Sequence, residues 1–114
     1  MTILVVDDDP LLRLIVRDAL QEKGFGTTEA SDGIEGYEII QEIGDSIGSL
    51  LTDTYMTRIG FSLALSAAEE NPGMLILFMT GQPSHLLDVR TSSSVLEKPV
   101  LLHDLIRAVR SVQA

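Results

Sequence analysis

The sequence contains no cysteine and no tryptophan, and only two tyrosines and three phenylalanines among its 114 residues. Without cysteine the chain can form neither a disulfide nor a thiolate metal site, and a reducing compartment is permitted. No apolar run approaches the length of a membrane span, and the start lacks the basic region of a signal peptide. We therefore expect a cytoplasmic protein with a core of leucine, isoleucine and valine.

Basic residues are also scarce. The chain has eight lysines and arginines against 17 acidic residues, which gives a net charge of −9. This charge argues against binding to nucleic acid or an anionic membrane. The length suits one domain, so we expect residues 1–114 to form it. The sequence shows no repeat and no linker, and we expect any output domain to be a separate polypeptide.

The stretch from Ile3 to Pro10 is the most informative, because four β-favouring apolar residues run into three aspartates. A short unbroken apolar run predicts a strand buried on both faces, as in a parallel sheet. Asp9 before Pro10 is typical of a helix N-cap followed by proline at the first helical position. For Asp7 and Asp8 two interpretations stay open, a solvated acidic turn or a site for a hard cation, most naturally Mg²⁺.

Strand-like and helix-like segments alternate along the rest of the chain. We expect strands over 3–6, 25–29, 49–52, 74–79 and 95–96, the second at an edge of the sheet because it is less apolar. We expect helices over 11–23, from the Asp32–Glu35 capping pair onward, over 61–70, over 84–90, and around Leu102, Leu105, Ile106 and Val109. Gly44 and Gly48 should bracket the turn before the third strand. Five β/α units predict a doubly wound parallel sheet with helices on both faces.

Polar residues stand where these strands end: Asp7, Asp8, Asp53, Thr80 and Lys98. The carboxyl ends of parallel strands share one edge, so we expect the five side chains to converge. Three carboxylates stay ionised together around a divalent cation, and Mg²⁺ suits phosphoryl chemistry with a carboxylate nucleophile. Taken singly, Asp53 can be a turn residue or N-cap and Lys98 a surface lysine. His85 and His103 lack a partner at metal-ligand spacing and should be surface residues.

With these five positions in this order and spacing, the chain resembles a response-regulator receiver domain, CheY-like, over essentially all 114 residues. The resemblance implies a flavodoxin-like five-stranded sheet of order 2-1-3-4-5. It implies that Asp53 accepts a phosphoryl group from a histidine kinase or phosphotransfer protein. It also implies that Asp8, Asp53 and the backbone carbonyl of Tyr55 ligate Mg²⁺, that Asp7 acts largely through water, and that Thr80 and Lys98 contact the phosphoryl oxygens.

The same resemblance implies a signalling module, a monomer or weak dimer, that acts on a separate downstream protein. Its chemistry would be limited to its own phosphorylation and dephosphorylation, so it would not be an enzyme. Two alternatives remain: a pseudo-receiver that binds proteins without phosphate, and an aspartate-nucleophile phosphohydrolase, for which 114 residues leave no room for a cap.

The chain departs from the family pattern at several places. Thr57 replaces the usual proline after Met56, Gly60 arrives one residue early, and Val95 stands where the family has an aromatic residue. The segment from Thr80 to Lys98 is short and rich in glycine, proline and serine. We therefore expect a short or mobile helix there, and a signal that travels without an aromatic switch.

Overall fold

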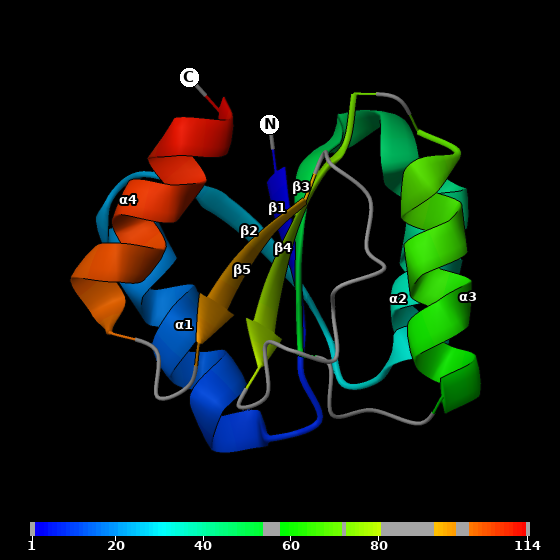
Figure 1. Cartoon of the computed structure of the whole chain (residues 1–114), viewed down its shortest axis with the longest axis horizontal. Coiled ribbons are helices and arrows are strands. Elements are labelled where there is room, and N and C mark those ends of the chain that lie inside the picture. The colour runs from blue at the N-terminus through cyan, green and yellow to red at the C-terminus, as the bar shows by residue number, and fades with distance from the viewer. Residues whose placement is uncertain (1, 54–57, 72, 81–92, 98–100, 114) are drawn as a thin grey trace.

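The computed structural model of the chain describes residues 2–53, 58–71, 73–80, 93–97 and 101–113. Its strands pair in parallel in the order β2-β1-β3-β4-β5, which confirms the predicted doubly wound sheet. Figure 1 shows α1 and α4 on one face of the sheet and α2 and α3 on the other. The strands are β1 (Thr2–Val6), β2 (Gly26–Ala30), β3 (Ile47–Asp53), β4 (Leu75–Thr80) and β5 (Ser93–Glu97). The helices are α1 (Pro10–Glu22), α2 (Gly33–Ile43), the short 3-10 helix η1 (Gly44–Ser46), α3 (Arg58–Glu69) and α4 (Leu102–Gln113).

Strand β1 is buried on both faces, as its apolar run predicts, because Ile3 to Val6 are all 0% exposed. Successive side chains of a strand point to opposite faces, so β1 contributes to two separate apolar clusters. Leu4 and Val6 belong to one cluster with residues of α2 and α3. Ile3 and Val5 belong to the other with residues of α1 and α4. Burial of these side chains holds the helices to the sheet.

The predicted helix ends are also present. The Asp9 carboxylate accepts hydrogen bonds from the backbone amides of Leu11 and Leu12 at 3.0 and 3.3 Å, with Pro10 at the first helical position. The Asp32 carboxylate caps α2 by accepting from the Glu35 amide at 2.8 Å. After α1 the chain passes through Gly24 at φ +89°, a conformation that favours glycine. These features set the direction of the chain after β1 and on both sides of β2.

The prediction that Gly48 brackets the turn before the third strand is wrong, because that strand already begins at Ile47. The turn is η1, and Gly48 lies buried within β3. Thr2 pairs with Ile47 while Ile3 pairs with Ser49, so the pairing of β1 and β3 shifts register at Gly48. A glycine inside a strand often marks such a bulge, which explains why it resembled a turn residue. Helix α3 begins at Arg58, three residues before its predicted start, and the helix expected over 84–90 lies outside the described residues.

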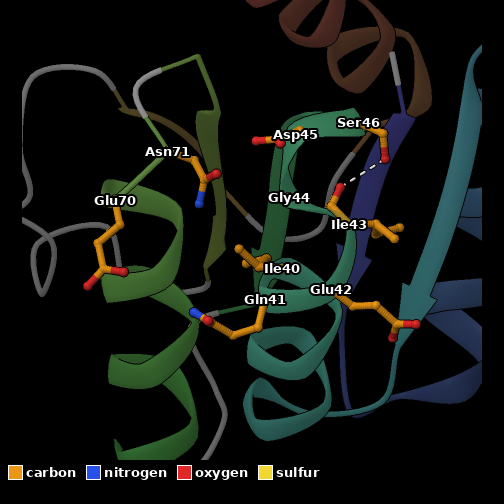
Figure 2. Close-up of a pocket in the computed structure, with 9 residues that line it drawn as sticks. All are labelled: Ile40, Gln41, Glu42, Ile43, Gly44, Asp45, Ser46, Glu70 and Asn71. Atoms are coloured by element: carbon orange, nitrogen blue, oxygen red, sulfur yellow. Dashed lines mark hydrogen bonds between the residues drawn. The ribbon is translucent and has the colours of Figure 1, made fainter.

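Helices α2 and α3 approach closely where α2 begins. A Cβ atom added to Gly33 would overlap the backbone carbonyl of Gly60, so glycine at position 33 allows the contact. At the other end of the same helices, a hollow of about 510 Å³ lies between the end of α2, η1 and Asn71 (Figure 2). It opens at the edge where β3 begins, away from the carboxyl ends of the strands. Among the described residues, no helix is both long and apolar enough to cross a membrane.

Candidate functional site

Three carboxylates come together at the carboxyl ends of two adjacent inner strands, β1 and β3. Asp7 and Asp8 directly follow β1, and Asp53 is the last residue of the adjacent β3, where Val6 pairs with Thr52. One carboxylate oxygen from each lies within 4.8 Å of the other two. Asp7 is 0% exposed and Asp53 2% exposed, whereas Asp8 is exposed. The structure therefore brings together the three acids that the sequence analysis singled out.

Hydrogen bonds to β2 and within the loop hold the loop that carries Asp7 and Asp8. Asp7 donates its amide to the carbonyl of Ala30 in β2 at 3.2 Å, and its Oδ1 accepts from the amide of Asp9 at 2.9 Å. Asp9 in turn caps α1. On the β3 side, the buried Thr52 hydroxyl donates to the carbonyl of Asp53 at 3.1 Å. The acids thus stand on a backbone that neighbouring strands and a helix N-terminus constrain.

The donor set fits a hard divalent cation. All three side chains offer carboxylate oxygens, which Mg²⁺ prefers, and their separation allows one ion to contact more than one of them. Three carboxylates this close repel one another, and a divalent cation removes that repulsion. Exposure of Asp8 leaves one side of the cluster open to water, and Mg²⁺ usually keeps several waters.

The remaining predicted site residues are placed only in part. Thr80 ends β4, one residue beyond Met79, which pairs with Asp53, so its backbone lies at the same edge of the sheet as the acids. Tyr55 and Lys98 lie outside the described residues, as does His85. His103 is a surface residue, as expected, with its side chain 68% exposed and 3.1 Å from an Asp104 oxygen.

Sequence reasoning missed two residues beside the acids, Arg13 in α1 and Glu29 in β2. Arg13 donates to the backbone carbonyl of Asp7 at 2.7 Å and to Glu29 at 3.3 Å. Sixteen residues separate the two, and nothing in their local sequence links them. The available signal was that α1 follows the acids directly and that β2 was expected beside β1, which together bring an α1 side chain near the end of β2.

Comparison with known proteins identifies the family. The response regulator receiver domain model matches residues 3–110. The chain belongs to the response regulator receiver family. It is 33% identical to the response regulator receiver protein CpdR of Brucella abortus over 115 residues, covering 96% of this chain and 94% of that one.

Solved structures agree with this assignment. A response regulator receiver protein from Sinorhizobium medicae superposes with a TM-score of 0.87 at 29% identity, covering 98% of this chain and 93% of that one. The receiver domain of the hybrid histidine kinase CckA superposes with a TM-score of 0.86 at 26% identity, covering 100% of both chains. The predicted CheY-like fold is therefore confirmed, and the chain functions in two-component phosphorelay signalling. A phosphate-independent scaffold is not favoured.

Proposed function

We propose that this receiver is a Mg²⁺-dependent phosphoacceptor and that Asp53 is the residue that is phosphorylated. The observation that carries the proposal is the cluster of Asp7, Asp8 and Asp53 within 4.8 Å, with Asp53 at the end of a central strand. Asp7 and Asp8 belong to the loop that opens α1, whereas Asp53 alone ends a strand and faces both of them. This division suits two residues that only bind the metal and one that both contacts the metal and reacts.

In the proposed reaction a carboxylate oxygen of Asp53 attacks the phosphorus of a phosphohistidine on the donor protein. The new O–P bond forms as the P–N bond breaks, and the imidazole leaves with the electron pair of that bond. Bound Mg²⁺ would neutralise charge on the phosphoryl oxygens. Asp7, Asp8, Asp53 and the backbone carbonyl of Tyr55 would hold it, Asp7 largely through water. Thr80 would donate a hydrogen bond and Lys98 a positive charge to the transferred group.

The phosphoryl donor needs a surface beside the acids, and α1 offers one. Leu11, Leu14 and Ile15 project from the first turns of the helix that follows Asp7 and Asp8, and they are 65%, 40% and 43% exposed. Exposed apolar side chains at this spacing suit contact with a helix of another protein. We propose that a histidine kinase or phosphotransfer protein docks here.

The other proposed properties follow from composition and family. We propose a cytoplasmic monomer or weak dimer that signals to a downstream protein and binds neither nucleic acid nor membrane, in keeping with its net charge of −9. Its only chemistry would be its own phosphorylation and dephosphorylation, so it would not be an enzyme acting on a separate substrate.

Intact-mass measurement tests the acceptor. Incubation with acetyl phosphate and Mg²⁺ should add one phosphate to the wild type, and chelation of Mg²⁺ should prevent it. Asp53→Asn should gain none. Asp45→Asn, which makes the same change in the exposed η1 turn, should behave as the wild type. A full phosphate on the Asp53→Asn variant would refute the assignment.

A further inference from the structure

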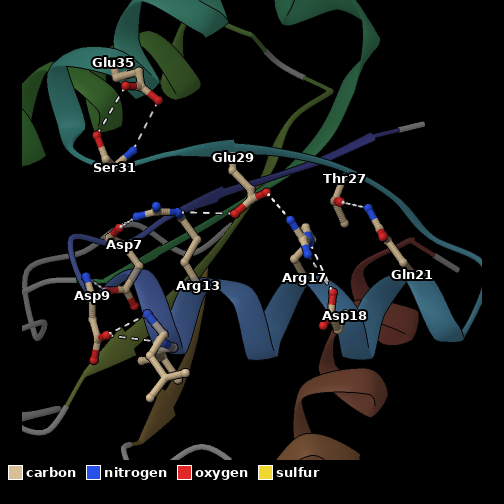
Figure 3. A network of polar contacts seen from close by, with 12 residues as sticks. Asp7, Asp9, Arg13, Arg17, Asp18, Gln21, Thr27, Glu29, Ser31 and Glu35 are labelled. Atoms are coloured by element: carbon tan, nitrogen blue, oxygen red, sulfur yellow. Dashed lines mark hydrogen bonds and ion pairs between the residues drawn. The ribbon is translucent and has the colours of Figure 1, made fainter.

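Arg13 directly contacts the backbone of the loop that carries Asp7 and Asp8, called the acid loop below. Its side chain is 20% exposed, and its Nη1 donates to the carbonyl oxygen of Asp7 at 2.7 Å. That carbonyl belongs to the peptide that joins Asp7 to Asp8. Figure 3 shows the guanidinium lying between the Asp7 loop and Glu29. A hydrogen bond from a charged donor at this distance is among the stronger polar contacts in proteins. Arg13 therefore limits rotation of the peptide group between Asp7 and Asp8, and so limits movement of both acidic side chains.

Glu29 holds Arg13 in this position. It accepts from Arg13 Nε at 3.3 Å through Oε1 and from Arg17 Nη1 at 3.1 Å through Oε2. Arg17 also donates to Asp18, and its hydrogen bonds to Asp18 and then Glu29 hold the pKa of Arg17 above its usual value. Glu29 is anchored in β2, where it pairs with Val5 of β1. Nε and Nη1 of Arg13 belong to one planar guanidinium group, so the contact of Nε with Glu29 also orients Nη1 toward the carbonyl of Asp7.

The acid loop is thus tied to β2 on both sides of Asp7. Its amide bonds to Ala30 and its carbonyl bonds to Arg13, which is held by Glu29. Repulsion among the three carboxylates pushes the loop away from Asp53 when no cation is bound. The two ties oppose that movement and keep the oxygens close together.

We infer that Arg13, oriented by Glu29, is a positioning residue that holds Asp7 and Asp8 in the arrangement that binds Mg²⁺. This inference rests on the proposed metal site. Groups that orient metal ligands affect affinity without touching the ion. The inferred action is mechanical rather than electrostatic, since the positive charges of Arg13 and Arg17 are matched by Glu29 and Asp18.

Positioning and a pure charge effect predict opposite changes in Mg²⁺ affinity when Arg13 is replaced. If Arg13 positions the loop, Arg13→Gln weakens Mg²⁺ binding because the oxygens are no longer held together. If Arg13 acts only as a charge, Arg13→Gln strengthens Mg²⁺ binding because a cation near the site has been removed. Arg13→Lys keeps the charge but loses the planar fork, so positioning predicts weaker binding than wild type, and a pure charge effect predicts no change.

Titration with Mg²⁺ alone, followed by calorimetry or amide chemical shifts, measures these effects. Arg13→Gln should raise the Mg²⁺ dissociation constant by about tenfold. Arg17→Gln is the matched control, since Arg17 also binds Glu29 but does not reach Asp7, and it should change affinity much less. Unchanged or tighter binding by Arg13→Gln, or an equal loss in both variants, would overturn the inference. A wild type that binds no Mg²⁺ would instead overturn the proposed function.

A second readout needs no metal. The amide of Asp9 is bonded to Asp7 Oδ1, so its exchange with solvent in chelator reports how well the loop is held. Exchange at Asp9 should accelerate in Arg13→Gln and Arg13→Lys but not in Arg17→Gln. Thermal melting of each variant separates this local effect from a general loss of stability. If both Arg13 variants keep wild-type exchange at Asp9, the tie between Arg13 and Asp7 does not hold the loop.

Discussion

Removing the charge of Asp8 should stabilise the metal-free protein. At 4.8 Å, two carboxylates repel by about 3.5 kcal/mol at an effective dielectric of ~20 and by about 0.9 kcal/mol in bulk water. Asp8 takes part in two of the three pairs, with Asp7 and with Asp53. Because Asp8 is exposed, the value for water is the better guide, and Asp8→Asn should raise the free energy of unfolding by about 1–2 kcal/mol. For a chain of this length that corresponds to an increase in melting temperature of about 4–8 °C.

Circular dichroism melts in chelator at low ionic strength measure the effect. Added salt should reduce it by screening, and added Mg²⁺ should stabilise the wild type more than the variant. Glu38→Gln on the exposed face of α2 changes the net charge equally and controls for the general reduction of an excess negative charge. An Asp8→Asn variant that melts below the wild type in chelator would refute the reasoning, as would an equal gain in Glu38→Gln.

Two further predictions concern packing and signal output. Gly33→Ala should lower the free energy of unfolding by about 1–3 kcal/mol in denaturant titrations, because the new methyl meets the Gly60 backbone, whereas Gly73→Ala has open space and should be near neutral. Hydrogen exchange with and without beryllofluoride should show protection rising mainly over residues 81–95, a stretch whose glycine, proline and serine content predicts low local stability. Equal and high protection there in both states would exclude an order–disorder switch.

Much of the fold could be predicted because short apolar runs alternate with helical periodicity. Each run is short enough to be a strand, and a polar residue ends β3, β4 and β5 and directly follows β1. The prediction for Gly48 failed because glycine, with its wide range of backbone conformations, is favoured both in turns and in the bulges of strands. The strand order came from the family resemblance rather than from these patterns, since pairing between strands depends on contacts far apart in the sequence.

The acid cluster could be predicted from the sequence for a similar reason, but the bond from Arg13 that holds its loop could not. Asp7, Asp8 and Asp53 could be grouped because parallel strands end at the same edge of a sheet. The bond between Arg13 and Asp7 depends instead on where a helical side chain points relative to a strand end. The sequence does not set Arg13 apart from the other basic residue of α1, because it does not show that Glu29 faces Arg13.

The strand order itself explains why the site forms at β1. From β1 the chain passes through α1 to β2, which pairs with one edge of β1. From β2 it returns through α2 to β3, which pairs with the opposite edge of β1. One neighbour supplies Asp53, which completes the acid cluster. The other supplies Ala30 and Glu29, which secure the loop that carries Asp7 and Asp8. If β2 lay elsewhere in the sheet, the carboxylates would still meet but the loop would lose both ties. The position of β1 between β2 and β3 therefore places Asp53 and the two ties of the loop on opposite sides of the loop that carries Asp7 and Asp8.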